Sequence, residues 1–422
     1  MTHDRASPEL SSDTFFDEPP SQPSTVRWEP TRAAGLARLD AFLPRAGRAY
    51  ARDRNIDFGP ADRRNISALS PWIRRRLVTE EEVVAAVVAR HGFVAASKFI
   101  DEVCWRSYWK GWLQLRPAIH ARYLGDCAAL DRRLSLEPAL AERVASACAG
   151  NIGIDCFDAW ARELVETGFL HNHARMWFAS IWIFTLKLPW QLGARFFARH
   201  LLDYDPASNL LSWRWVGGLH SVGKHYLARA ENIRAFTNGR FFPKGQLDER
   251  APPLVEDASR APLGLLPMPD SIRADAIALL LNSEDLHPES WRVTPPVVGV
   301  AAFAPADADE TGAPARLFRD GSLVDGLQRA QSHFSAPNGG ALDAVGVVAW
   351  ARALGVREIV TGFAPIGETC AALDAMEHEL AAAGIRLTRL RRQWDEIAWP
   401  QATAGFFRFR EVIPELVALT AR

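Results

Sequence analysis

The sequence lacks the cysteine pattern that a disulfide framework or a zinc site requires. Its 422 residues include five cysteines, an odd number, and no two of them form a CxxC pair, which argues for a reducing compartment. The N-terminus lacks the basic start and the apolar run of a signal peptide. No window holds the roughly 18 unbroken apolar residues of a spanning helix. We therefore expect a cytoplasmic protein that has no membrane span and no metal site.

Positive charge is not in excess either. The chain has 49 Lys and Arg against 50 Asp and Glu, a net charge of -1, so the broad basic surface of many nucleic-acid-binding proteins is not indicated. A local basic face is compatible with these numbers. A Gly-rich phosphate loop is also missing, so the sequence does not support dinucleotide binding by its C-terminal half. Tryptophan, in contrast, occurs 15 times, and we expect most of these side chains in the core.

Hydrophobic periodicity indicates a helical domain in the first part of the chain. Residues 1–30 are rich in Ser, Pro and acidic residues and are predicted to lack stable structure. Residues 31–245 space their apolar side chains by three and four nearly throughout, which predicts one large all-helical domain. Within it, Thr79 and Glu82 have the spacing of a capping box at the start of a helix.

The second part of the chain has a different pattern. Residues 246–270 are Pro-rich and charged and are predicted to form a linker. In residues 271–422, the predicted strands PPVVGVAAFAP, REIVTGFAP and IRLTRLRR alternate with helical patterns, which is typical of a parallel α/β sheet. The predicted fold class is therefore multidomain α and α/β, a large all-helical domain followed by a smaller Rossmann-like α/β domain.

A charged residue lies within the most apolar helical stretch. Residues 169–190 read FLHNHARMWFASIWIFTLKLPW and are apolar almost all round, which predicts a long helix buried on every side. Arg175 lies in this stretch, and a buried guanidinium is costly unless an anion meets it. Asp203 and Asp205 are the nearest candidates. The pair could be a structural ion pair or a fixed charge that holds an anionic cofactor ring.

Two hydroxyls and a run of arginines precede the next helical segment. Ser67 and Ser70 stand just before Pro71, and the start of a helix favours a phosphate, although an N-cap explains the same pattern. The run of residues 74–76, Arg-Arg-Arg, is typical of a solvated face and is also compatible with contact to a nucleic-acid backbone.

One helical face in residues 99–112 is both aromatic and charged. Glu102, Trp105, Arg106 and Trp109 fall at i, i+3, i+4 and i+7. Such a face suits a flat ligand that stacks on Trp and meets fixed donors and acceptors, and a nucleobase is such a ligand. An aromatic helical bundle without a ligand is the alternative.

Four segments occur in the order found in the FAD-binding domain of DNA photolyases and cryptochromes. They are SALSP, EVCWR, FLHNHARM and DYDPASNLLSWRW, and the resemblance covers about residues 40–245. It implies a helical domain with a U-shaped FAD and a deoxyribodipyrimidine photolyase-like enzyme, which splits cyclobutane pyrimidine dimers in UV-damaged DNA by light-driven electron transfer from reduced FAD. The alternative is a cryptochrome-like blue-light photoreceptor that binds FAD and signals through an unknown partner without DNA repair.

The resemblance also implies roles for individual residues. Arg175 would lie over the isoalloxazine, Asp203 would be its counter-ion, and Asp205 would lie on the flavin and adenine side. The residues expected to hold the phosphates and the ribityl chain are Tyr50, Ile66, Ser67, Leu69 and Ser70. The residues expected to line the cavity for a flipped dimer are Glu102, Trp105, Arg106 and Asn172. The pair Asn172 and Met176 is of the type seen with cyclobutane dimers.

The family reduces its flavin in light through a chain of tryptophans. Trp213 and Trp190 match the inner and middle members, although Trp190 could instead be a core residue. No Trp occurs from 113 to 159, where the outer member is expected, so the chain would stop early or pass through Trp160 or Tyr204. The position that faces flavin N5, usually Asn in repair enzymes, is expected at Leu210, which favours the photoreceptor alternative.

The C-terminal half resembles the later part of a photolyase antenna domain more loosely. The segment WARALGVREIVTGFAPIGETCAALDAMEHELAAAGIRLTRL is followed by WDEIAWPQATAGFFRFREVIPEL, which is rich in aromatic residues. The resemblance implies an antenna domain placed after the FAD domain, with a second chromophore of unknown kind. An unrelated Rossmann-like domain is the alternative.

Overall fold

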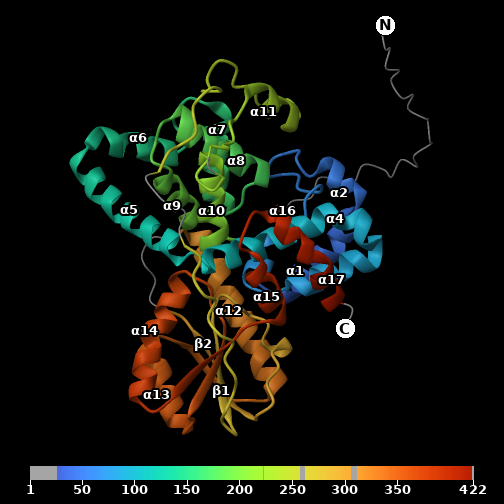
Figure 1. Cartoon of the computed structure of the whole chain (residues 1–422), viewed down its shortest axis with the longest axis vertical. Coiled ribbons are helices and arrows are strands. Elements are labelled where there is room, and N and C mark those ends of the chain that lie inside the picture. Colours follow the sequence, from blue (N-terminus) through green and yellow to red (C-terminus); the bar gives the residue numbers. More distant parts are fainter. Residues whose placement is uncertain (1–25, 222, 257–261, 306–310, 421–422) are drawn as a thin grey trace.

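The computed structural model describes residues 26–221, 223–256, 262–305 and 311–420. Helices form the upper part of the molecule in Figure 1, and a sheet with its own helices forms the lower part. The predicted fold class is confirmed. Residues 1–25 of the predicted tail lie outside the described part, whereas the ring of Trp28 stacks on Phe169 with the centroids 5.0 Å apart.

The helical region runs from the start of α1 to the end of α11. Its helices are α1 (Arg32–Phe42), α2 (Arg48–Asp53), α3 (Ser70–Arg74), α4 (Glu80–Gln114), α5 (Pro117–Leu136), α6 (Pro138–Cys148), α7 (Asp155–Thr167), α8 (Asn172–Ser180), α9 (Trp190–His200), α10 (Pro206–Gly217) and α11 (Ala230–Phe236). The single helix predicted for residues 169–190 is shorter: α8 continues only through a π-helical turn at Ile181–Thr185. Pro189 explains the stop, because the residue before a proline disfavours helical backbone.

The long helix α4 is the element on which many others pack. The predicted capping box is confirmed, because Thr79 and Glu82 each accept a hydrogen bond from the other's backbone N–H. Gly92 interrupts the helix with a φ of 71°. Length and composition alone would allow α4 to cross a membrane. In this structure α2, α5, α10 and the last helices of the chain pack against it instead.

The strands of the α/β region form one parallel sheet with the order β3-β2-β1-β4-β5. They are β1 (Ile277–Leu281), β2 (Val297–Phe303), β3 (Asn338–Leu342), β4 (Glu358–Gly362) and β5 (Arg386–Leu390), with helices α12 (Ala313–Phe334), α13 (Ala344–Leu354) and α14 (Glu368–Ala382). The sequence predicted β2, β4 and β5 but missed the other two. β1 reads IALLL and is buried at every position, so it has no alternation, and β3 contains two glycines.

Alternate side chains of the central strand enter two different cores. Leu279 and Leu281 belong to one hydrophobic core with α12 and the helical region, whereas Ala278 and Leu280 pack with α13 and α14. This division follows from the two-residue period of a strand. One face of the sheet therefore shares a continuous core with the helical region.

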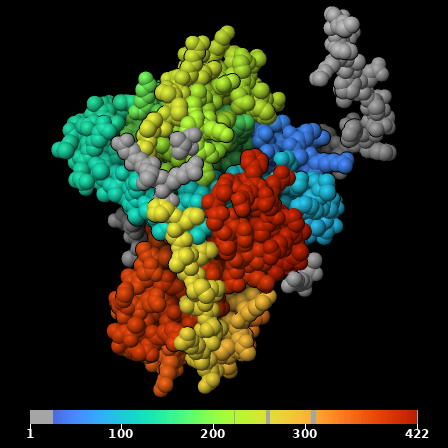
Figure 2. Space-filling model, in the orientation of Figure 1, coloured from blue at the N-terminus to red at the C-terminus, as the bar shows by residue number. Residues whose placement is uncertain are grey.

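After the sheet, the chain returns to the helical region. The last helices, α15 (Gln393–Ala398), α16 (Phe406–Phe409) and α17 (Ile413–Leu419), all pack on α4. We call residues 393–419 the C-terminal strap; Figures 1 and 2 show it in red in front of α4. The sequence placed these residues in the α/β unit of residues 271–422. Their contacts place them on α4, because the strap buries its own aromatic side chains there.

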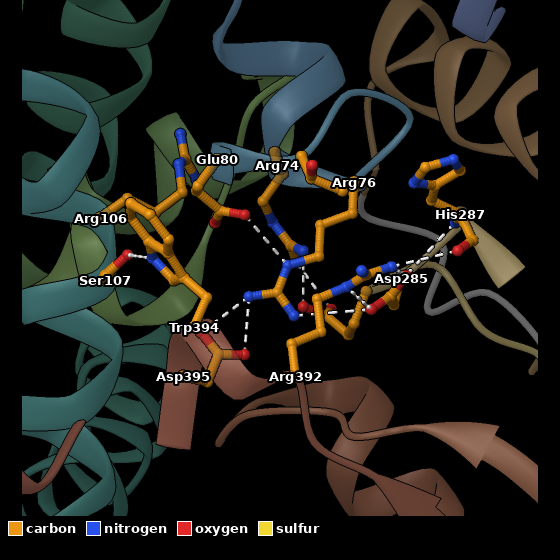
Figure 3. Close-up of polar contacts among 12 residues, drawn as sticks. Arg74, Arg76, Glu80, Arg106, Ser107, Asp285, His287, Arg392, Trp394 and Asp395 are labelled. Atoms are coloured by element: carbon orange, nitrogen blue, oxygen red, sulfur yellow. Dashed lines mark hydrogen bonds and ion pairs between the residues drawn. The ribbon is translucent and has the colours of Figure 1, made fainter. Parts of the chain in front are cut away.

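The arginine run of residues 74–76, expected at the surface, is buried where the helical region meets the sheet. Figure 3 shows Arg76 at the centre of this contact. Its Nη2 donates to both oxygens of Asp395 at 2.8 and 2.7 Å, and its Nε donates to Glu80 at 3.3 Å. Burial is tolerated because the carboxylates neutralise the charge. The surface and DNA-contact interpretations of this run are therefore wrong.

The other charges of this interface follow the same arrangement. Arg74 binds Glu284 through two hydrogen bonds of 2.5 and 2.7 Å, and Arg392 binds Asp285 at 2.6 and 2.8 Å. Glu284 and Asp285 follow the carboxyl end of β1, next to β4 in the sheet. The strand order reverses between β1 and β4, and an open α/β sheet usually binds its ligand at the carboxyl ends of the strands at this position. Here those carboxylates bind arginines of the interface.

Candidate functional site

Arg175 and Asp203 form the ion pair that the sequence predicted. Nη2 of Arg175 donates to Oδ2 of Asp203 at 2.9 Å, and Nε donates to the Leu170 carbonyl at 3.0 Å. The Asp203 side chain is 3 % exposed, but that of Arg175 is 23 % exposed. The expectation that Arg175 is buried on every side is therefore wrong. It lies in the first turn of α8, where fewer neighbouring turns cover it.

Asp203 has one carboxylate oxygen available. Burial acts to raise the pKa of Asp203, but the charges of Arg175 and Arg106 and the Ser70 hydroxyl hold it below its ordinary value. The group is therefore ionised at neutral pH. Oδ1 is buried and has no hydrogen-bond partner within the described residues. Because buried polar atoms are normally paired, this oxygen suits a donor N–H of a bound ligand.

The turn before α3 is held by Arg38. Its Nε donates to the Ser67 carbonyl at 2.6 Å, and its Nη2 donates to the Ile66 carbonyl at 2.8 Å. Leu69 is fully buried, and Ser70 is the first residue of α3. Since α3 has only five residues, its start is not by itself a phosphate site. The side chain of Ser70 lies close to Asp203 and helps to lower its pKa.

The charged and aromatic residues on one face of α4 contact different neighbours. Glu102 forms an ion pair with Arg54, and burial raises the pKa of Glu102 above its ordinary value. Arg106 donates to Asp205 at 3.2 Å. Asp205 also accepts hydrogen bonds from two backbone N–H groups as the N-cap of α10, so it positions α10 and Arg106 together.

Tyr50 lies beside this face, at the other end from Arg106. Its ring meets Phe99 edge-on with the centroids 5.0 Å apart, and burial raises its pKa. The phenol is therefore neutral. Arg54 lies one turn after Tyr50 in the chain. The charge of Arg54 acts to lower the pKa of Tyr50, and the charge of Glu102 acts to raise it.

Trp105, expected to face an open cavity, is covered by the C-terminal strap. Its ring stacks on Phe406, with the centroids 3.8 Å apart and the planes 9° apart. Asn172, expected on the same cavity, lies exposed at the start of α8. The structure therefore brings Trp105 into contact with Phe406, a residue that the sequence did not indicate. The aromatic pattern of the segment AGFFRF was the available signal.

The tryptophans of the predicted electron-transfer chain lie on neighbouring helices. Trp213 is 2 % exposed and fits against Gly193, where an added Cβ would approach its ring to 2.3 Å. Trp190, one turn before Gly193, stacks on Tyr123 with the centroids 5.7 Å apart and the planes 25° apart. Tyr123 lies on α5 and is partly exposed.

The two aromatic residues suggested as the outer member lie elsewhere. The ring of Trp160 stacks on Trp177, and Tyr204 is bonded through its carbonyl to Arg74. Sequence reasoning missed Tyr123, which lies in the segment that has no Trp. The presence of this tyrosine in the segment could have identified it as a candidate for the outer member.

Leu210 is buried in α10 at 3 % exposure. The preceding Asn209 donates its side-chain amide to the Ala194 carbonyl at 2.8 Å. The amide of Asn209 thus joins α10 to α9.

Two hollows lie on the surface of the described region. One, of about 550 Å³, lies beside Phe242 and Leu247. The other, of about 540 Å³, is lined in part by Arg122, Trp190 and Glu256. Trp190 is 6 % exposed and borders this second hollow.

The chemistry of the donor set fits FAD. Arg175 supplies a fixed positive charge beside Asp203, whose Oδ1 is an acceptor with no partner in the part of the chain that the structure describes. A flavin ring offers N–H donors, and its reduced form carries negative charge, so both groups would find a partner. Ser70 and the turn of residues 66–69 lie next to this pair.

Comparison with known proteins supports this fit. Residues 99–244 match the family model of the FAD binding domain of DNA photolyase. A deoxyribodipyrimidine photo-lyase of Thermus thermophilus is 32 % identical over 209 residues, 48 % of this chain and 46 % of the relative. A cryptochrome DASH of Idiomarina loihiensis is 27 % identical over 225 residues, 52 % of this chain and 47 % of the relative. The chain thus spans about half the length of the curated relatives it matches.

A solved structure is also similar to about half of this chain. It is a bacterial class III photolyase from Agrobacterium tumefaciens, with a TM-score of 0.41 and 26 % sequence identity over 49 % of this chain and 43 % of that one. The family match covers α4 from Phe99 onward together with Arg175, Asp203 and Trp213.

Proposed function

The chain belongs to the DNA photolyase and cryptochrome family through its FAD-binding domain, and on this premise we propose that it splits cyclobutane pyrimidine dimers in DNA in blue light. The observation that carries the proposal is the pair of Arg175 and Asp203, in which a buried ionised carboxylate keeps one oxygen without a partner among the described residues. Buried polar atoms are normally paired, so this oxygen supports a ligand that donates a hydrogen bond to it.

Each residue of the site has a role in this proposal. Bound FAD supplies light absorption and the electron that opens the cyclobutane ring. Arg175 would stabilise negative charge on the ring, and Asp203, which binds Arg175, would accept a hydrogen bond from the ligand. The residues that position the phosphate and ribityl part are Tyr50, Ile66, Ser67, Leu69 and Ser70. Trp213 and Trp190, followed by Tyr123, would form the path along which an electron reaches the bound flavin.

The substrate side is formed by α4 and α8. An extruded pyrimidine would stack on the ring of Trp105, on which Phe406 stacks in this structure. Glu102, Arg106 and Asn172 would supply the polar groups for the base, and Asp205 binds Arg106. The partner in this proposal is UV-damaged DNA, and the reaction takes place in the cytoplasm.

A blue-light photoreceptor without repair activity is the second candidate, and the covered face of Trp105 favours it. Phe406 lies where the lesion base would have to stack. Leu210 would also leave the flavin without a hydrogen-bond partner if it faces N5. In this candidate, the α/β region or the strap transmits the signal, and an antenna chromophore is a further proposal for the α/β region.

Two measurements test the proposal in sequence. The purified protein should show the flavin band near ~450 nm, alone or after reconstitution with FAD. The reduced protein should then restore a thymine-dimer oligonucleotide in blue light and leave it unchanged in the dark. Flavin reduction in light without any restored oligonucleotide would support the photoreceptor. A protein that cannot be loaded with FAD would contradict both candidates.

A further inference from the structure

The C-terminal strap is fastened to α4 on both sides of α16. Before α16, the hydroxyl of Tyr108 donates to the Ala404 carbonyl at 2.8 Å. After α16, Nε of Arg410 donates to Asp101 at 3.0 Å. The four residues of α16 thus connect two fixed points on the surface of α4.

Between these points, Phe406 lies flat on Trp105. The centroids are 3.8 Å apart and the planes 9° apart. The rings of Phe406 and Phe409 both meet the ring of Tyr108 at steep angles, 81° and 62°. The parallel stacking of Phe406 is therefore made with Trp105 and not with Tyr108. A nucleobase that binds on an aromatic side chain adopts the same parallel arrangement.

We propose that Phe406 is an internal occupant of the base site on Trp105, and that a flipped pyrimidine must displace it in order to bind. This inference rests on the proposed function. Opening a base pair costs least where a lesion has weakened its stacking, and displacing Phe406 adds a further cost. An intact pair then does not reach Trp105 and is held only through its backbone. Phe406 is therefore a specificity-determining residue for damaged DNA.

The position of α16 allows it to leave Trp105 while the rest of the strap stays attached. Residues 403–405 are exposed, and Phe407 is 86 % exposed. The inward side chains of α16 are thus Phe406 and Phe409. On either side, Trp399 and Leu416 are fully buried. A short segment that lies between buried anchors and buries only two side chains of its own, Phe406 and Phe409, can open locally with less free energy than global unfolding needs.

The test compares dark binding of two duplex oligonucleotides, identical except for one cyclobutane thymine dimer, at a fixed salt concentration. Phe406→Ala in the FAD-loaded full chain should bind the dimer duplex about tenfold more tightly than the unchanged protein, because the base no longer competes with a stacked ring. Phe406→Leu keeps apolar volume but removes the flat ring, and should show a smaller gain. Phe407→Ala removes an exposed ring from the same helix and should show no gain.

A double-mutant cycle shows whether the gain arises at Trp105. If it does, Phe406→Ala should give no gain when combined with Trp105→Ala. Thermal unfolding of each variant separates binding from loss of fold, and Phe406→Leu provides the folded comparison if Phe406→Ala is unstable.

The outcomes distinguish this inference from the proposed function. If the unchanged protein prefers dimer DNA and neither Phe406 variant binds it more tightly, Phe406 is a packing residue and the inference alone is wrong. If Phe406→Ala still tightens binding to dimer DNA when it is combined with Trp105→Ala, the gain does not arise at Trp105 and the inference alone is again wrong. If no variant distinguishes dimer DNA from intact DNA, the proposed repair function and this inference both fail.

Discussion

Arg76 and Arg175 carry the same charge in two regions that use it differently. The Arg76 side chain is 4 % exposed and lies within 3.5 Å of Glu80, Asp285 and Asp395. The Arg175 side chain is 23 % exposed and binds one carboxylate. A charge surrounded by several carboxylates is already neutralised and can only hold elements together. A charge with one partner and an open side can still meet a ligand.

The two regions also differ in what they connect. The interface of Arg76 joins α3, the carboxyl end of β1 and the strap, which are far apart in sequence. The flavin region joins α8 to the turn before α10, which are close in sequence. We therefore expect substitutions in the interface to affect folding first and substitutions in the flavin region to affect cofactor binding first.

The largest effect should follow Arg76→Ala. It leaves three buried carboxylates without their common cation, and breaking such a buried group typically costs about 3–5 kcal/mol of unfolding free energy. Urea unfolding followed by circular dichroism measures the loss. The control is Arg133→Ala, whose pair with Glu137 lies at the surface and should change nothing measurable. Equal stability of the two variants would show that the interface does not hold the two regions together.

Arg175→Ala should have the next largest effect, and on the cofactor rather than on the fold. Without the guanidinium, Asp203 and the flavin lose their shared positive charge, so the ratio of absorbance near ~450 nm to that at ~280 nm should fall strongly. The unfolding free energy should fall by only about 1–3 kcal/mol, because Asp203 loses one charged hydrogen bond. Arg175→Lys keeps the charge and should retain part of the flavin. A fully loaded Arg175→Ala protein would contradict the role we assign to this residue.

Acid should weaken the interface through Asp285. Burial acts to raise the pKa of Asp285, but Arg392 and Arg76 hold it below its ordinary value. A lowered pKa in the folded state means that the stabilisation is complete above the unfolded value of about 3.9 and is lost as the pH falls towards the folded value. Asp285→Asn should therefore reduce stability at neutral pH and flatten its decline between about pH 5 and pH 3. Asp40→Asn, at an exposed position, is the control, and an unchanged slope in Asp285→Asn would contradict the assignment.

Local patterns predicted the parts of the molecule whose partners are near in sequence. The capping box of Thr79 and Glu82 and the ion pair of Arg175 with Asp203 both join residues within 28 positions of each other. The strands β2, β4 and β5 have recognisable apolar patterns for the same reason. Both partners of such an interaction lie in one short stretch of the chain, where a sequence pattern can indicate them.

Partners that are distant in sequence could not be predicted in this way. Arg76 meets Asp395 across 319 positions and Arg74 meets Glu284 across 210, so an arginine run that is typical of a solvated face is buried. Trp105 shows the same limit, because its partner Phe406 comes from the other end of the chain. A stripe of polar and aromatic side chains indicates that a face is unusual, but not which segment covers it.

The smallest effect should follow Tyr123→Phe, which changes no charge and leaves the ring on Trp190. If Tyr123 ends the electron path, the rate of light-driven flavin reduction with a thiol reductant should fall a few-fold, because a phenyl ring is much harder to oxidise than a phenol. Trp190→Phe should slow the rate more, and Trp160→Phe, remote from Trp190, should leave it unchanged. Stability should be the same in all three proteins to within about 1–2 kcal/mol. An unchanged rate in Tyr123→Phe would place the end of the path at Trp190, which borders the surface hollow next to Arg122.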